Sequence, residues 1–386
     1  MTRTEDNRTT SDVLQLLTSE GLDGMGEAVR CLINIGMKIE RQQYLGLSPY
    51  ERSDNRRDSA NGFKPKTVKT RLGELTFDIP QVRNGEFYPN SLERGVRSER
   101  ALKLTLAEMY VQGVSTRNVA KITQELCGFE VSSTQVSRAA QELDPMLQQW
   151  RNRLLGSFPY LFLDARYEHV RSGGVVVSSA VLTAIGISED GKRSVLGTSV
   201  AISEQEVHWR EFLNSLQKRG LHGVKLIISD AHAGLQAARI AVFPSVPWQR
   251  CQFHLQQNAQ SYVPKKDMKV KVAADIRDIF NAPEKEEAER RLKLFIDKYT
   301  KSAPRLAQWA EQNLTEGLTV FSFPSAHRVK IRTSNPLERL NREIKRRTSV
   351  ASIFPNEASC LRLVSAVLME ISEEWETGAK YLKLCE

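Results

Sequence analysis

Phe158-Pro-Tyr-Leu-Phe-Leu-Asp164 is a short apolar run that ends at an acidic residue. Such a run predicts a buried strand with one carboxylate at its end. Val224-Lys-Leu-Ile-Ile-Ser-Asp230 repeats the pattern further along the chain. A single aspartate after a strand is as easily explained as a turn or a helix cap. Two of them in the same setting indicate a shared site.

The residues around these two runs carry alternating strand and helix patterns. Their periodicity predicts strands at 175–187, 194–202 and 248–253, and helices at 206–220 and 234–242. The order is then strand, strand, strand, helix, strand, helix, strand, which is that of an RNase H-like core with a mixed five-stranded sheet. The predicted fold class is therefore α/β. The strands that precede Asp164 and Asp230 are neighbours in such a sheet, so the two carboxylates should converge at one edge.

A third acidic residue is predicted on the helix in Arg332-Thr-Ser-Asn-Pro-Leu-Glu-Arg-Leu-Asn-Arg-Glu-Ile-Lys-Arg-Arg347. We expect Asn335 to cap this helix, Pro336 to occupy its first position and Glu338 to complete a capping box. Glu338 and Glu343 diverge by roughly 140° around the helix, so they cannot serve one site together. The spacing alone leaves the choice between them open.

Composition favours a protein that binds a polyanion, with nucleic acid as the first candidate. The chain has 386 residues, long enough for two or three domains, and a net charge of +9. An inert basic surface is the alternative. The five cysteines are scattered and odd in number, so no disulfide framework is expected. Neither a signal peptide nor a membrane span is evident, which predicts a cytoplasmic protein with no membrane partner.

Residues 102–150 predict three helices separated by a Gly-x-Ser turn and a second turn. This pattern is typical of a helix-turn-helix. Its last helix would offer polar side chains to the major groove or its phosphates, and the preceding helix adds one cation. The candidate DNA contacts here are Arg117, Ser133, Thr134, Gln135 and Arg138. An ordinary three-helix bundle is the alternative interpretation.

We expect five segments along the chain. They are an N-terminal helical and small β module (1–100), the helix-turn-helix domain (101–152), the first part of the core (153–254), an all-helical insertion (255–328) and the closing part of the core (329–386). In the first, a strand at 68–80 should be followed by a hairpin turn at Asn84-Gly85. The helices at 11–44 serve either dimerisation or DNA binding. A linker is expected at Asp144-Pro145 and 151–157.

The converging carboxylates predict a metal site. Carboxylate oxygens suit Mg²⁺, and two such ions can clamp the attacking and leaving oxygens of a phosphodiester displacement. Cys251-x-x-His254 resembles half of a zinc site, but no second Cys/His pair lies nearby in the sequence. A structural or DNA-positioning role near the acids fits this pair better.

Four motifs carry a family resemblance: Tyr160-Leu-Phe-Leu-Asp-Ala-Arg166, Ile227-Ile-Ser-Asp-Ala-His-Ala-Gly-Leu235, Arg250-Cys-Gln-Phe-His254 and Thr333-Ser-Asn-Pro-Leu-Glu-Arg-Leu-Asn341. With these four motifs in this order, the chain resembles bacterial Mutator-type insertion-sequence transposases of the DDE superfamily. The resemblance implies a catalytic and metal-binding triad of Asp164, Asp230 and Glu338, which settles the choice against Glu343.

The resemblance also implies function. It predicts two Mg²⁺ or Mn²⁺ ions per site, a homodimer associated with the bacterial nucleoid, and binding to terminal inverted repeats and target DNA. The cations around Glu338 would then form a phosphate cradle. With the Cys-x-x-His pair, the candidate contacts are Cys251, His254, Arg332, Asn341, Arg342, Lys345, Arg346 and Arg347. A nuclease or resolvase that only hydrolyses, and a catalytically inert DNA-binding regulator, are the alternatives.

Overall fold

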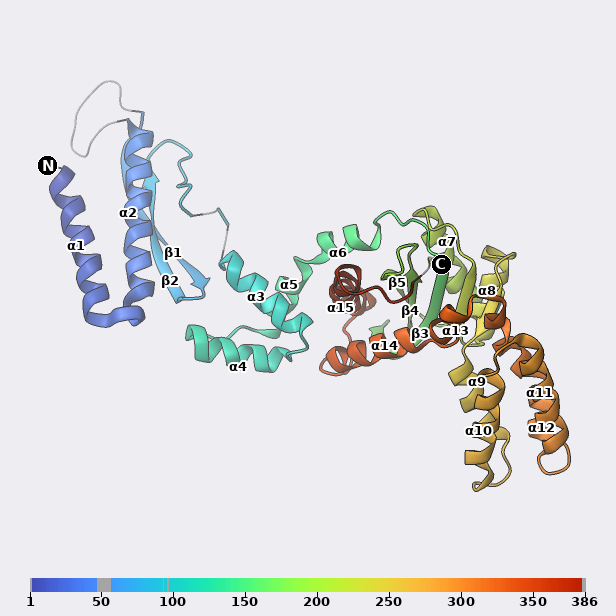
Figure 1. Ribbon diagram of the computed structural model, residues 1–386. Helices are drawn as coiled ribbons and strands as arrows, with labels where there is room; N and C mark the ends of the chain where they lie inside the picture. The colour runs from blue at the N-terminus through green and yellow to red at the C-terminus, as the bar shows by residue number, and fades with distance from the viewer. Residues whose placement is uncertain (1, 47–56, 93, 96, 384–386) are drawn as a thin grey trace. The chain divides into compact units, whose positions relative to one another are not determined.

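The computed structural model describes residues 2–46, 57–92, 94–95 and 97–383. The chain forms two compact units, Met1–Glu142 and Leu143–Glu386. The second unit contains a mixed five-stranded sheet (Figure 1), so the prediction of a mixed α/β fold is confirmed. Its strands are β3 (Tyr160–Ser172), β4 (Val175–Ile187), β5 (Arg193–Ala201), β6 (Leu226–Ser229) and β7 (Trp248–Arg250).

The strands lie in the order β5-β4-β3-β6-β7. β3, β4 and β5 pair antiparallel, and β6 and β7 run parallel to β3. The parallel register pairs Phe162 with Ile228. Asp164 and Asp230 each lie two residues further on, so the register carries them to the same level of the sheet.

Helices cover both faces of this sheet. Leu161 and Leu163 of β3 belong to a buried cluster with side chains of α7 (Glu206–Lys218) and α8 (Ala233–Val242). Successive strand side chains point to opposite faces, so Asp164 lies on the other one. There α14 (Asn335–Thr348) and α15 (Glu357–Thr377) contact β3.

β3 is longer than the sequence predicted. It continues past Asp164 to Ser172, because its antiparallel pairing with β4 runs along its whole length. Its parallel pairing with β6 stops at Phe162. Asp164 therefore lies inside a strand, at the point where the neighbouring parallel strand has ended.

An all-helical segment separates β7 from α14. Residues 251–334 are all described, and none of them lies in a strand. The α-helices of this segment are α9 (Gln252–Ala259), α10 (Met268–Phe280), α11 (Lys285–Tyr299), α12 (Pro304–Asn313) and α13 (Ser325–Ile331).

The start of α14 corrects one prediction. The N-cap is Ser334, so Glu338 falls one position beyond the capping-box site, and no side chain caps the helix. The Ser334 hydroxyl is instead hydrogen-bonded to Cys251 Sγ at 3.3 Å. This tertiary contact removes the residue that would otherwise cap the helix.

The first unit also departs from two predictions, the first of which is a single strand at 68–80: a hairpin turn divides these residues between two strands. Its elements are α1 (Thr2–Glu20), α2 (Met25–Leu45), β1 (Ala60–Thr70), β2 (Gly73–Val82), α3 (Arg100–Val111), α4 (Thr116–Cys127) and α5 (Ser133–Gln141). The hairpin turn lies between Thr70 and Gly73, where Gly73 adopts a φ of +109°. The backbone N–H groups of Asn84 and Gly85 instead donate to the Asp58 carboxylate, so the predicted hairpin turn there is wrong.

The expected linker at Asp144-Pro145 is instead helix α6 (Asp144–Arg151). Proline in the first helical turn costs no hydrogen bond. The guanidinium of Arg362 on α15 donates two 2.7 Å hydrogen bonds to the Asp144 carboxylate. These bonds attach α6 to α15 within the second unit.

Candidate active site

Asp164 is held by a side chain of α14. Asn341 Nδ2 on α14 donates a 2.6 Å hydrogen bond to Asp164 Oδ2. Burial raises the pKa of Asp164 to about 6, although the Asn341 hydrogen bond acts to lower it. Asp230 follows β6 and accepts a 2.7 Å hydrogen bond from the backbone N–H of Ala231. The two carboxylates thus lie at one level of the sheet, Asp164 within β3 and Asp230 just after the end of β6.

The structure separates the two glutamates of α14. Glu343 accepts hydrogen bonds from Arg346 and Arg347, and these bonds lower its pKa to about 2. Glu338 has a buried Oε1 that has no hydrogen-bond partner among the described residues. Residues three apart share a helix flank, so Glu338 lies on the flank of Asn341, which contacts Asp164. An unsatisfied buried carboxylate oxygen is costly in a protein interior, which marks Glu338 as the acid with an unfilled role.

Cys251 and His254 lie beside the two aspartates. Cys251 is fully buried, so its side chain is not available to DNA in this structure. It raises the pKa of His254 to about 9 against the effect of burial, and the charges of Asp230 and Asp164 act in the same direction as Cys251. An imidazolium beside two carboxylates offsets part of their mutual repulsion.

Glu204 is a further acid near Asp164 that sequence reasoning missed. Its carboxylate, only 12% exposed, lies 3.5 Å from Nδ1 of His232, and its charge acts to raise the pKa of Asp164. Gly234 at the start of α8 permits this approach, because a Cβ there would lie 2.2 Å from the Glu204 carbonyl oxygen. A glycine two residues after His232 is the only hint of such close packing that the sequence carries.

The cations expected around Glu338 differ in their exposure and in whether they pair with an acidic side chain. Arg342 and Lys345 are exposed on α14. Arg347 is 5% exposed and pairs with Glu343 and with Glu370 of α15. Arg346 is exposed but pairs with Glu343.

Two of the expected DNA contacts near Glu338 have partners within the protein. Arg332 Nη1 donates a 2.8 Å hydrogen bond to Asn281 Oδ1. The Asn341 amide is bound to Asp164. Among the residues of the proposed cradle, Arg342 and Lys345 are therefore the best placed to meet a phosphate.

The candidate DNA contacts of the first unit lie on α4 and α5. Arg117, Ser133, Thr134 and Arg138 are exposed. Gln135 is half-buried, and its Oε1 accepts a hydrogen bond from the backbone N–H of Ser132 in a capping box. Ser133 and Thr134 thus lie exposed in the first turn of α5, and Arg138 lies exposed in its last turn.

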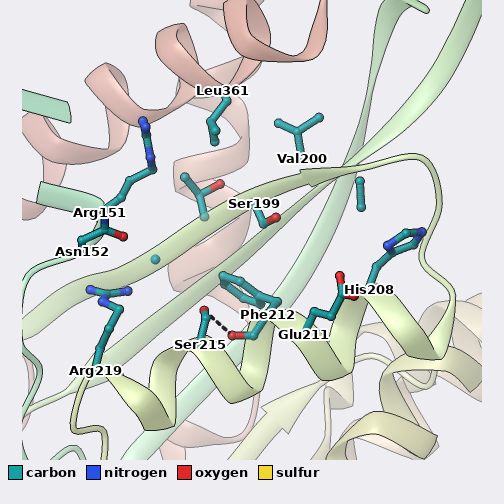
Figure 2. A pocket seen from close by; sticks show the side chains of 13 residues that line it. Arg151, Asn152, Ser199, Val200, His208, Glu211, Phe212, Ser215, Arg219 and Leu361 are labelled. Carbon is teal, nitrogen blue, oxygen red and sulfur yellow. Dashed lines mark hydrogen bonds between the residues drawn. The ribbon is translucent and has the colours of Figure 1, made fainter. Parts of the chain in front are cut away.

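The described side chains do not themselves form a metal-binding group. Among the residues that the structure describes, no three Asp, Glu, His or Cys side chains gather closely enough to hold an ion. The pocket in Figure 2 lies along β5 and α7, where Arg151, His208 and Arg219 line it, and it includes none of the three acids. No helix in the described part of the chain has the length and apolarity to span a membrane.

Similarity to known proteins extends over nearly the whole chain. Residues 1–378 match the family model for transposases of the Mutator family. The chain is 61% identical over 368 residues to the transposase for insertion sequence element IS406 of Burkholderia multivorans, covering 95% of each chain. It is 42% identical over 385 residues to the transposase for ISRM5 of Rhizobium meliloti, covering 100% of this chain and 96% of that one.

A third relative is the transposase for IS256 in transposon Tn4001 of Staphylococcus aureus. It is 39% identical over 356 residues, covering 90% of each chain. The family match covers all of the first compact unit and the second unit up to residue 378. The chain belongs to the Mutator family of transposases.

Proposed function

We propose that the protein is a DNA transposase that binds the terminal inverted repeats of its own insertion sequence and carries out Mg²⁺-dependent strand cleavage and strand transfer. Asp164, Asp230 and Glu338 form its catalytic DDE triad. In keeping with the family resemblance, the proposal includes a homodimer, because two element ends take part in one event.

One observation carries this proposal. Asp164 and Asp230 lie at the same level of neighbouring parallel strands, and Asn341 ties α14 to Asp164. Glu338 lies one helical turn before Asn341 and has a buried, unbonded Oε1. The three acids thus belong to elements that meet at one sheet edge.

The donor set fits a hard divalent cation. Three carboxylates supply oxygen ligands of the kind that Mg²⁺ and Mn²⁺ prefer, and the unbonded Oε1 of Glu338 has no competing partner among the described residues. When bound, two such ions would activate the attacking oxygen and stabilise the leaving oxygen of a phosphodiester. Asn341 orients the Asp164 carboxylate for this role.

The sheet topology supports an RNase H-like assignment for the core. Three antiparallel strands are followed by two strands parallel to β3, with helices between them. The helical segment between β7 and α14 would then be an insertion in that core. In the first unit, the capped helices α4 and α5 support a helix-turn-helix in which Arg138 and Thr134 contact DNA.

The test is cleavage and joining of a labelled duplex that carries one end of the protein's own element, with Mg²⁺ or Mn²⁺. We expect the parent to nick the end and transfer it, and Asp164→Asn, Asp230→Asn and Glu338→Gln each to lose both products while retaining end binding. Glu343→Gln on the same helix is the matched control and should remain active.

Other outcomes separate the alternatives. Hydrolysis without any joined product would identify a nuclease. End binding without either product in the parent would identify an inert regulator. An active Glu338→Gln together with an inactive Glu343→Gln would refute the assignment of the third acid.

A further inference from the structure

We propose that Cys251 is a positioning residue that holds the first turn of α14, and with it Glu338, against the strand that leads into Asp230. This inference rests on the proposed function, because it assigns Glu338 a place in the catalytic site. It gives the buried thiol a mechanical role without contact to DNA or to a metal ion.

Three parts of the chain meet at Cys251. Its backbone N–H donates a 2.9 Å hydrogen bond to the carbonyl oxygen of Ser229, the residue before Asp230. Its Sγ accepts hydrogen bonds from both the backbone N–H and the hydroxyl of Ser334, each at 3.3 Å. A single residue thus connects the end of β6 to the beginning of α14.

The connection continues from Ser334 to the third acid. Ser334 is the N-cap of α14, and its carbonyl oxygen accepts a 3.1 Å hydrogen bond from the backbone N–H of Glu338. The Ser334 side chain does not cap its own helix, since its hydroxyl is directed to the sulfur. The position of the first helical turn is therefore set from outside the helix.

Burial makes these hydrogen bonds hard to replace. Cys251 is 0% and Ser334 1% exposed. If the sulfur were removed, water could not reach the two donors of Ser334, and both would remain unsatisfied in the interior. The first turn of α14 would then be more mobile than it is in the parent protein.

The chain order explains why such a contact is needed. The Cys251 and Ser334 partners are 83 residues apart, at the entry and exit of the helical insertion. A second bond, from the Gln252 N–H to the Arg332 carbonyl oxygen at 3.0 Å, joins the same two places. A connection of that length exerts little control over the helix that follows it. We call these two contacts the neck of the insertion. They fix the position of α14, which the long connection alone would not fix.

The test compares full-length Cys251→Ala and Cys251→Ser with the parent by hydrogen exchange without metal. We expect Cys251→Ala to raise exchange about tenfold in peptides that cover residues 333–341, with α15 unchanged, because an opening of this turn exposes its amides. Serine keeps an acceptor at this position, so Cys251→Ser should exchange nearly as slowly as the parent. Cys360→Ala removes another fully buried thiol, on α15, and is the matched control.

A second measurement addresses the catalytic role. For cleavage of the labelled element end, Cys251→Ala should need a several-fold higher Mn²⁺ concentration for half-maximal rate, with end binding unchanged. Equal exchange at residues 333–341 in Cys251→Ala and the parent would overturn the proposal. So would an increase spread evenly over the second unit, or a serine variant no better than alanine.

Two further outcomes remain decisive. If the parent cleaves no DNA, the proposed function fails while hydrogen exchange still tests the contact. If Cys251→Ala does not fold, Ser334→Ala removes only the hydroxyl donor from the other side. It should then raise exchange in the first turn of α14 by a smaller factor, and no increase there would overturn the proposal.

Discussion

Asn341 Nδ2 on α14 donates a 2.6 Å hydrogen bond to Oδ2 of Asp164 on β3. This bond joins the helix of the third acid to the strand of the first, across a separation of 177 residues. It also acts to lower the pKa of an aspartate that burial raises to about 6. The amide therefore affects both where Asp164 lies and how readily it ionises.

Replacing that amide should impair catalysis through Asp164. Asn341→Ala should cut the cleavage rate at pH 7 by about tenfold or more. Without the donor, the pKa of Asp164 rises further, so the pH–rate profile should shift to higher pH. Asn335→Ala on the same helix, at an exposed position, is the control and should leave the profile unchanged. An unshifted profile for Asn341→Ala would contradict the assigned contact.

The raised pKa of Asp164 should be visible in stability. Its folded-state pKa of about 6 lies above the ordinary 3.8. The charged carboxylate therefore destabilises the metal-free fold fully above pH 6, and this penalty vanishes as the pH falls below the ordinary value. Asp164→Asn should raise the free energy of unfolding by on the order of 1 to 3 kcal/mol at pH 8, and by less at pH 5.

Urea denaturation at the two pH values measures this difference. The exposed Asp297 on α11 provides a control, since Asp297→Asn should change stability little at either pH. A stability gain for Asp164→Asn that is equal at both pH values would exclude ionisation as its cause.

Arg346 and Arg347 are adjacent arginines with different environments. Arg347 is buried and pairs with Glu343 and Glu370, so Arg347→Ala should cost about 2 to 4 kcal/mol of unfolding free energy. Arg346 is exposed, and Arg346→Ala should change the free energy of unfolding little. Chemical denaturation of both variants tests the contrast, and equal losses would refute it.

Gly234 provides a test of the packing that holds Glu204 near Asp164. A Cβ at Gly234 would meet the Glu204 carbonyl oxygen at 2.2 Å, so backbone must move. Gly234→Ala should destabilise the protein by about 1 to 3 kcal/mol and slow cleavage. Gly156 has open space where a Cβ would lie, and Gly156→Ala should do neither. Melting temperature and cleavage rate of the two variants provide the comparison.

The first unit offers a pair of substitutions that separates folding from DNA binding. Ser132 caps α5, so Ser132→Ala should lower stability by about 1 kcal/mol. Arg138 is exposed, so Arg138→Ala should leave stability unchanged but weaken end binding and reduce the salt dependence of log K by about one unit. Binding isotherms at several salt concentrations measure this slope. A slope unchanged by Arg138→Ala would remove it from the DNA interface.

Local patterns predicted most of the second unit. The apolar runs before Asp164 and Asp230, and the amphipathic pattern of α7, are periodicities that a sequence displays directly. The predicted strand order made the runs before Asp164 and Asp230 neighbours, and the level shared by the two aspartates followed from it. These features depend on residues close together in the chain.

The departures arise from distant partners. The extension of β3 to Ser172 depends on pairing with β4, and the lost cap of α14 depends on Cys251. Asn341 was expected to meet DNA, and its partner Asp164 lies far away in the sequence. In the first unit, Asn84-Gly85 does not form the predicted turn, because the backbone N–H groups of both residues donate hydrogen bonds to the Asp58 carboxylate. No periodicity reports such contacts.

The neck between Cys251–Gln252 and Arg332–Ser334 has a consequence for how this architecture tolerates change. Its hydrogen bonds bring the first and last residues of the insertion side by side. Segments of quite different length can therefore be spliced between these two points without altering the spacing of the strands. We expect lineages of this fold to vary most in size there, and protein engineers to find in it a natural site for grafting a foreign domain.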